Sequence, residues 1–297
     1  MDVTGRSKTY RLIAIDLDGT LLGPDGKLSR RTKSAVHGAL SSGLRICFAT
    51  GRNWTESRSV IQESEHHDWA VFVGGAMVVD TKSGATVRRT LVESKLAAEI
   101  CAFIESKGHA ALALQDTGMA DVDYLATIDA PLNESTERWI RATGALMQRV
   151  KGLGSHSHPH TVRLGIVAST AVATLFLDDL VAEFGQRIAC HRVGVTPHGS
   201  DVLEIFGPSV SKWEGVRHIA EKYGIEQSQV IAVGDDVNDL AMIRAAGLGL
   251  AMGNAKPEVQ AAADQVIGSN RDDGLAKFLE ELVEGNESVY IKLKDGK

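Results

Sequence analysis

The sequence predicts an α/β protein with a doubly wound parallel-sheet core and an inserted α+β domain. Apolar runs alternate regularly with helical patterns in residues 1–83 and again in residues 207–297, which is typical of a parallel sheet with right-handed crossovers. In residues 84–206 the apolar runs and helical patterns follow one another less regularly. The chain also has 30 glycines and six prolines, and only 5% of its residues are aromatic, which favours many strand-to-helix turns over disorder.

The first segment predicts a β-α-β-α-β unit. An apolar strand over 11–17 leads through a polar loop to a helix whose N-cap is Ser29. Apolar strands over 44–49 and 69–73 enclose a second helix over 54–62. Strands joined by helices in this way run parallel, so their carboxyl ends meet at one edge of the sheet, where such folds place their ligands.

The insertion predicts strands and helices in a less regular order. Its strands are expected at 86–91, 110–114, 161–168, 187–193 and 201–205, and its helices at 94–107, 134–147 and 171–184. After Pro208 the alternation returns, with helices at 211–223, 238–246, 257–263 and 273–284 and strands at 229–233 and 248–251. We therefore expect residues 1–83 and 207–297 to form one discontinuous core domain and residues 84–206 to form a separate α+β domain.

Composition excludes several classes of function. Lysine and arginine number 32 against 38 acidic residues, a formal net charge of 32 − 38 = −6, so no basic excess is present for binding nucleic acid. No stretch approaches the ~18 apolar residues of a membrane span, and the first apolar run, Leu12–Ile15, is too short for a signal peptide. Cys47, Cys101 and Cys190 lie far apart without metal-binding spacing. We expect a cytoplasmic protein with no membrane partner; its oligomeric state is not readable from the sequence.

The clearest chemical signal is the pair Asp16 and Asp18 in the segment DLDGT, at the carboxyl end of the first predicted strand. Two carboxylates held this close repel one another unless a cation compensates them, and hard oxygen ligands suit Mg²⁺. Gly19 permits the tight turn that lets an anion approach. A solvated acidic turn is the alternative interpretation of this pair alone.

Two further polar segments follow predicted parallel strands. The segment Thr50–Arg52 offers a hydroxyl and backbone donors beside a glycine. In GDDVND, Asp235 and Asp239 lie four residues apart at a helix start, where they can converge on one cation, and Asn238 adds a neutral donor. Lys212, at the start of the preceding helix, supplies a positive charge for a phosphate. The segment DLDGT and the two segments described here, Thr50–Arg52 and GDDVND, are expected at the same edge of the sheet.

The order DLDGT, ATGR, SK, GDDVND and AMGNA resembles the haloacid dehalogenase superfamily, and within it the Cof-like phosphatases. The resemblance covers both core segments. It implies a Rossmann-like catalytic core, and the insertion of roughly 120 residues is similar to the large α/β cap of that subfamily, which selects the substrate. It also implies a small phosphorylated metabolite as substrate and Mg²⁺ as cofactor.

The resemblance further implies a role for each motif residue. Asp16 would be the nucleophile and Asp18 the general acid and base, while Thr50 and Lys212 would hold the transferring phosphoryl group, with Gly51 beside them. Mg²⁺ would be bound by Asp235, the Asp16 carboxylate and the Asp18 backbone carbonyl, with Asp239 supporting it. Asn238 would contact the substrate phosphate.

Two positions depart from the family pattern, and one further motif stands apart from it. Gly74 replaces the usual asparagine after the third strand, and Trp213 replaces the glycine after the motif lysine, where it either packs in the core or lines the cleft. Both bear on substrate shape more than on reaction type. The alternating histidines His156, His158 and His160 either bind a transition metal or belong to a glycine-flanked loop of the cap.

These observations predict a phosphatase that hydrolyses a phosphate monoester, such as a sugar phosphate, through an aspartyl-phosphate intermediate. A sugar phosphomutase built on the same core is the nearest alternative, and it would keep the phosphate. An alternative of another class is a signalling protein in which Asp16 accepts a phosphoryl group without turnover. Receiver domains carry their acceptor aspartate after a later strand and lack DxDGT, which disfavours that second alternative.

Overall fold

The computed structural model describes residues 10–195 and 200–285, which form two compact units. The core unit contains residues 10–50, 59–71 and 211–285 of this described chain, and the cap unit contains residues 51–58 and 72–210 apart from 196–199. The domain limits expected at residues 84 and 206 remain a prediction.

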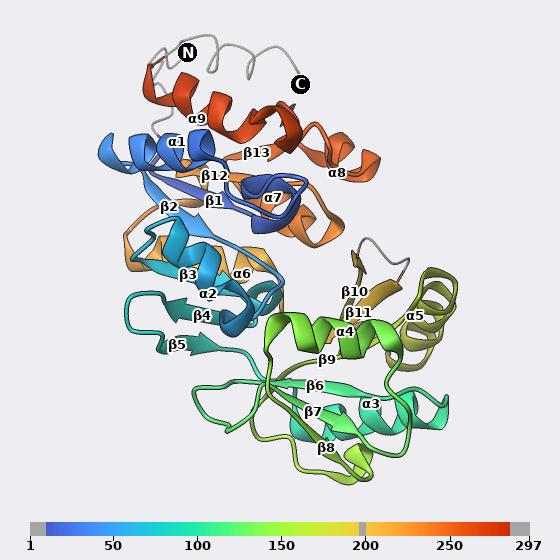
Figure 1. Ribbon diagram of the computed structural model, residues 1–297. Helices are drawn as coiled ribbons and strands as arrows, with labels where there is room; N and C mark the ends of the chain where they lie inside the picture. Colours follow the sequence, from blue (N-terminus) through green and yellow to red (C-terminus); the bar gives the residue numbers. More distant parts are fainter. Residues whose placement is uncertain (1–9, 196–199, 286–297) are drawn as a thin grey trace, which may run out of the picture. The chain divides into compact units, whose positions relative to one another are not determined.

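The core unit is built on a parallel sheet of five strands in the order β14-β13-β12-β1-β2 (Figure 1). The central strand β1 pairs with β2 on one side and with β12 on the other. The strands are β1 Leu12–Ile15, β2 Arg45–Phe48, β12 Val230–Gly234, β13 Leu248–Ala251 and β14 Gln265–Val266. Beyond β2, a parallel bridge joins Ala49 to Val71 of β3 (Trp69–Phe72).

The connections between strands of the core unit run in both directions along the sheet from β1. The chain moves outward from β1 to β2 through α1, and in the opposite direction from β12 to β13 through α7, so right-handed crossovers put these two helices on opposite faces of the sheet. Helix α9 packs with α1, and α6 packs with α7. The helices are α1 Arg30–Ser41, α2 Trp54–Glu63, whose residues 54–58 belong to the cap unit, α6 Lys212–Lys222, α7 Leu240–Ala245, α8 Pro257–Ala262 and α9 Gly274–Val283.

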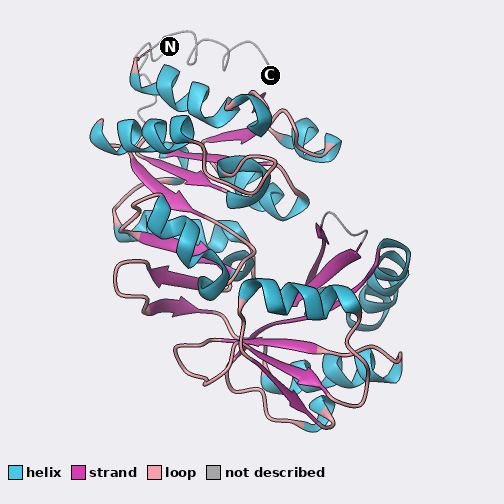
Figure 2. Cartoon of the chain, in the orientation of Figure 1, coloured by secondary structure: helices cyan, strands magenta, loops and turns pink. Residues whose placement is uncertain are grey.

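The cap unit holds a six-stranded sheet in the order β10-β11-β9-β6-β7-β8, which is antiparallel except where β7 pairs with β8 (Figure 2). Its strands are β6 Leu112–Gln115, β7 Tyr124–Thr127, β8 Met147–Val150, β9 Thr161–Ser169, β10 Ala189–Val195 and β11 Ser200–Phe206. Helices α3 Ser94–Ser106 and α5 Thr170–Phe184 form an apolar core with one face of this sheet, and α4 spans Glu134–Thr143. A hairpin of β4 Met77–Asp80 and β5 Thr86–Arg89 precedes them.

Most expected elements appear within two or three residues of their predicted limits, and local chemistry explains several ends. The Ser29 side chain accepts a hydrogen bond from the amide of Thr32 and so caps α1 as predicted. The helix expected to reach Met147 ends at Thr143, since Gly144 adopts a left-handed conformation. Strands β4, β7, β8 and β14 were not expected from the sequence. No helix of the described ranges 10–195 and 200–285 is long and apolar enough to cross a bilayer.

Candidate active site

The carboxyl end of β1 forms a tight turn that brings its polar side chains against the loop after β12. Asp16 is buried, and its amide donates to the Val233 carbonyl, which extends the β1–β12 pairing by one residue. Gly19 has a φ of +80°, and a Cβ at this position would lie 2.2 Å from Oδ2 of Asp235. Only glycine therefore lets the turn approach the Asp235 carboxylate this closely.

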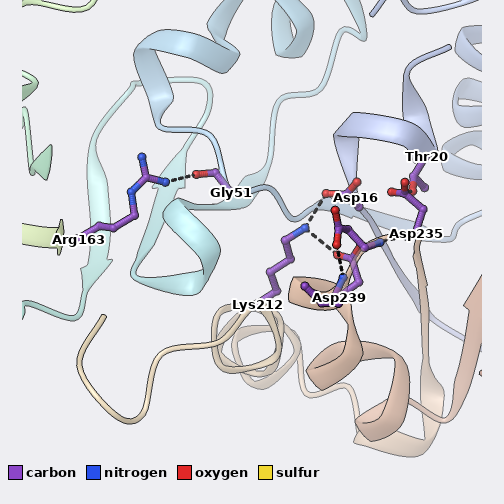
Figure 3. Close-up of polar contacts among 9 residues, drawn as sticks. Asp16, Thr20, Gly51, Arg163, Lys212, Asp235 and Asp239 are labelled. Carbon is purple, nitrogen blue, oxygen red and sulfur yellow. Dashed lines mark hydrogen bonds and ion pairs between the residues drawn. The ribbon is translucent and has the colours of Figure 1, made fainter. Parts of the chain in front are cut away.

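Three carboxylates meet at this edge of the sheet: Asp16, Asp235 and Asp239 each offer an oxygen within 4.8 Å of the others (Figure 3). Burial raises the pKa of Asp16 well above its ordinary value, and the charges of Asp239, Asp235 and Asp18 raise it further, against the opposing effect of Lys212. Burial and the charge of Asp239 likewise raise the pKa of Asp235 to about 7. Such mutual repulsion is relieved when a cation joins the group.

Lys212 is the one buried cation that contacts these carboxylates in the described chain. Its Nζ donates to Oδ1 of Asp16 and to Oδ1 of Asp239, both at 2.6 Å. It is the first residue of α6, whose N-cap Ser211 accepts from the amide of Glu214. The paired carboxylates raise the pKa of Lys212 despite its burial, so it stays an ammonium. One ammonium against three carboxylates leaves negative charge that a divalent cation would balance.

Asp239 organises the loop that carries Asp235. While its Oδ1 accepts from Lys212, its Oδ2 accepts from the backbone amides of Asp235 and Asp236, each at 3.0 Å. Asp239 is fully buried. Its carboxylate therefore fixes the backbone that presents Asp235.

Two side chains without a role in the sequence-based prediction also hold this site. The Thr20 hydroxyl donates to Oδ1 of Asp235 at 3.2 Å. The Asn254 amide donates to the Gly19 carbonyl at 2.9 Å and to Oδ2 of Asp235 at 3.5 Å. Thr20 lies in the motif DLDGT and Asn254 in the motif AMGNA, each directly after the glycine. A polar residue beside a motif glycine is therefore the sequence signal that could have identified them.

The other predicted site residues are distributed as follows. The Asp18 side chain is exposed and is not part of the three-carboxylate group found within the described residues. Thr50 is buried directly after β2, and its amide donates to Val71. Gly51 belongs to the cap unit, where its carbonyl accepts from Arg163. The Oδ1 atom of Asn238 is buried and has no hydrogen-bond partner in the described structure, so this acceptor is open to a hydrogen-bond donor.

The histidine run does not form a metal-binding group within the described chain, where the three aspartates are the only such group. His158 is buried, with Nδ1 hydrogen-bonded to the Thr161 hydroxyl and Nε2 to the Leu153 carbonyl. The Nε2 atom of His156 contacts the Lys151 carbonyl. This favours the interpretation of the run as a loop of the cap.

The two departures from the family pattern have local explanations. Trp213 is buried in α6, which favours core packing. Gly74 has a φ of +60°, and a Cβ there would come within 3.0 Å of the Phe206 ring. An asparagine at position 74 would therefore require this ring to move.

Comparisons with known proteins place these motifs in a family context. Residues 13–279 match the family model described as haloacid dehalogenase-like hydrolase. The 5-amino-6-(5-phospho-D-ribitylamino)uracil phosphatase YitU of Bacillus subtilis is 29% identical over 286 residues, covering 93% of this chain and 98% of that protein. The pyridoxal phosphate phosphatase YbhA of Escherichia coli is 28% identical over 285 residues, covering 91% and 98%.

Solved structures share the fold. The structure of a putative HAD/COF-like hydrolase from Plasmodium vivax superposes with a TM-score of 0.77 at 20% sequence identity, covering 95% of this chain and 98% of that one. The predicted fold class, a parallel α/β core with an inserted α+β cap, is confirmed.

Proposed function

Because this chain belongs to the haloacid dehalogenase-like hydrolase family, we propose that it is a magnesium-dependent phosphatase that hydrolyses a small phosphorylated metabolite through an aspartyl-phosphate. The resemblance to its Cof-like members is confirmed by the relatives and by the shared fold. The observation that carries the proposal is the buried Asp16 carboxylate, held by Lys212 beside Asp235 and Asp239.

The proposed reaction has two steps. Lys212 orients the Asp16 carboxylate through Oδ1, and Oδ2 attacks phosphorus. Asp18, whose exposed side chain can meet the leaving group, gives a proton to the departing oxygen. Asp18 then takes a proton from the water that hydrolyses the aspartyl-phosphate. Thr50, Gly51, Lys212 and Asn238 hold the phosphoryl oxygens as hydrogen-bond donors, Asn238 through its side-chain NH2 group.

The residues present fit a divalent metal. Three carboxylates, of which those of Asp16 and Asp239 are buried and that of Asp235 is half-buried, carry excess negative charge beside one ammonium, and oxygen is the donor that Mg²⁺ prefers. Asp16, Asp235 and the Asp18 backbone carbonyl would hold the ion, with Asp239 supporting Asp235. When bound, Mg²⁺ lowers the repulsion between the carboxylate nucleophile and the phosphate.

The substrate class is small and phosphorylated, in line with the two named relatives, whose substrates are a ribitylamino-pyrimidine phosphate and pyridoxal phosphate. These substrates differ chemically, so the relatives support the reaction rather than one metabolite. We propose that residues 84–206 select the leaving group and that the enzyme acts in the cytoplasm.

The test is phosphate release from a panel of sugar, nucleotide and cofactor monophosphates, with Mg²⁺ and with EDTA. We expect Mg²⁺-dependent release of inorganic phosphate by the wild type and none by Asp16→Asn. Transfer of phosphate between hydroxyls of one sugar without release would identify a phosphomutase instead. Stable labelling of Asp16 without release would identify a phospho-acceptor protein.

A further inference from the structure

A buried polar network lies on one face of the cap sheet. Along β9, Leu164 and Ile166 point into the apolar core formed with α3 and α5, so strand alternation puts Arg163 on the opposite face. Glu204 of β11 alternates in the same way with Leu203 and Ile205. Arg163 and Glu204 are both buried and form an ion pair through Nη1 and Oε1.

Arg163 also contacts the segment that follows Thr50. Its Nη1 donates to the Gly51 carbonyl at 2.9 Å (Figure 3), and its Nη2 donates to the Tyr124 hydroxyl at 3.0 Å. The Tyr124 hydroxyl in turn donates to Oε1 of Glu56 at 3.4 Å. The Arg163 guanidinium therefore contacts Gly51 directly and is linked to Glu56 through the Tyr124 hydroxyl.

Further contacts fix the rest of the segment. Glu56 Oε2 accepts from the Asn53 amide and Asn53 Oδ1 accepts from the Glu56 amide, which caps the start of α2. The Thr55 hydroxyl donates to Oδ1 of Asp123. Residues 51–56 are thus held by side chains of the cap sheet and its loops.

The orientation of the Gly51 carbonyl determines the direction in which the Arg52 amide points. In a trans peptide the carbonyl of Gly51 and the amide of Arg52 point in opposite directions. Gly51 has no side chain to resist rotation of this peptide, so an external contact must hold it. With the carbonyl directed at Arg163, the Arg52 amide is directed away from it.

We propose that Arg163, paired with Glu204, is a positioning residue that fixes the Gly51–Arg52 peptide and with it the phosphate-binding segment that begins at Thr50. The inference rests on the proposed phosphatase function for the role of Thr50. Arg163 acts through Gly51 and touches no phosphoryl group. A charged residue within the apolar run of β9 is the sequence feature that marks it.

The test is the double variant Arg163→Met/Glu204→Gln, together with Arg163→Met alone. The single variant leaves Glu204 buried and uncompensated and is expected to lose stability, whereas the double variant removes both charges and is expected to fold. Arg149→Met is the matched control, because Arg149 also donates from the cap sheet to backbone carbonyls, those of Thr127 and Ala130, but does not contact residues 51–56.

For the folded double variant we expect inorganic phosphate to bind roughly tenfold more weakly by calorimetry, because the network loses a charge-assisted hydrogen bond. The KM for p-nitrophenyl phosphate should rise by a similar factor. Amide hydrogen exchange should become faster in residues 50–58 but not in β6. Arg149→Met should leave the phosphate affinity, the KM and the exchange rates unchanged.

Unchanged phosphate affinity and unchanged exchange in the folded double variant would overturn the inference. So would a loss confined to substrates with large leaving groups, since Arg163 would then contact the leaving group. Absence of phosphate release by the wild type would instead remove the proposed function, while the exchange measurement would still decide whether Arg163 holds this segment.

Discussion

At the scale of single residues, Asp16 and Asp18 occupy opposite environments although one residue separates them. Asp16 is buried against Lys212, while the Asp18 side chain is exposed. A buried, oriented carboxylate suits a nucleophile, and an exposed one can exchange protons with water and a leaving group. Their substitution should therefore affect different steps.

We expect Asp16→Asn to lose several orders of magnitude in turnover of every phosphate ester, because no phosphoenzyme can form. Asp18→Asn keeps the nucleophile. With p-nitrophenyl phosphate, whose leaving group needs no proton, it should release about one nitrophenolate per enzyme in a burst and then stall. Rapid-quench kinetics and the intact mass of the protein measure both effects. Normal turnover of alkyl phosphates by Asp18→Asn would contradict the assigned role.

Lys212 is expected to stabilise the fold as well as the site. Lys212→Met leaves Asp16 and Asp239 facing one another without their shared ammonium, and removing one partner of a buried ion pair costs about 3–5 kcal/mol. Urea unfolding of the metal-free protein at pH 8 measures this. Lys256→Met is the control, because Lys256 pairs with Asp236 in a partly exposed position where the loss should stay below about 1 kcal/mol. Equal losses in the two variants would contradict the prediction.

At the scale of elements, the core was more predictable than the cap. The strands β1, β2 and β12 are apolar runs buried on both faces, apart from the exposed Arg45 that begins β2, and the site follows from their parallel arrangement. The β8 segment Met-Gln-Arg-Val has no such run, and it follows an amphipathic helix whose pattern extends into it. The Arg163 network depends on strands far apart in the sequence, which no local pattern reveals.

The turn after β1 yields a prediction for Gly19. Gly19→Ala faces both an unfavourable φ of +80° and a collision with the Asp235 carboxylate. Gly26→Ala is a matched control, because Gly26 has a φ of +73° with nothing within 4 Å of its Cβ position. Both should lose similar backbone stability, but only Gly19→Ala should need much more Mg²⁺ for half-maximal activity. A Mg²⁺ titration of phosphate release compares them, and equal requirements would contradict the role assigned to this close approach.

At the scale of the whole molecule, the carboxylate group makes stability depend on pH and metal together. Burial and neighbouring charge raise the pKa of Asp235 from 3.8 to about 7, so between these pH values the folded chain binds more protons there than the unfolded chain. Stability contributed by this group therefore falls as pH rises through that window when no metal is bound. Binding of Mg²⁺ needs the ionised carboxylate, so its stabilising effect should grow over the same window.

We therefore expect the Tm gained on adding Mg²⁺ to be larger at pH 8 than at pH 5, measured against the protein in EDTA. Asp235→Asn isolates the group, because its amide neither titrates nor repels Asp239. In EDTA this variant should gain stability relative to the wild type as pH rises from 4 to 7, and Mg²⁺ should stabilise it little at any pH. A difference in Tm between wild type and Asp235→Asn that stays constant from pH 4 to 8 would mean that Asp235 ionises normally in the folded chain. The repulsion among the three carboxylates would then already be relieved by Lys212 alone, and the argument for a divalent cation at this edge of the sheet would lose its electrostatic basis.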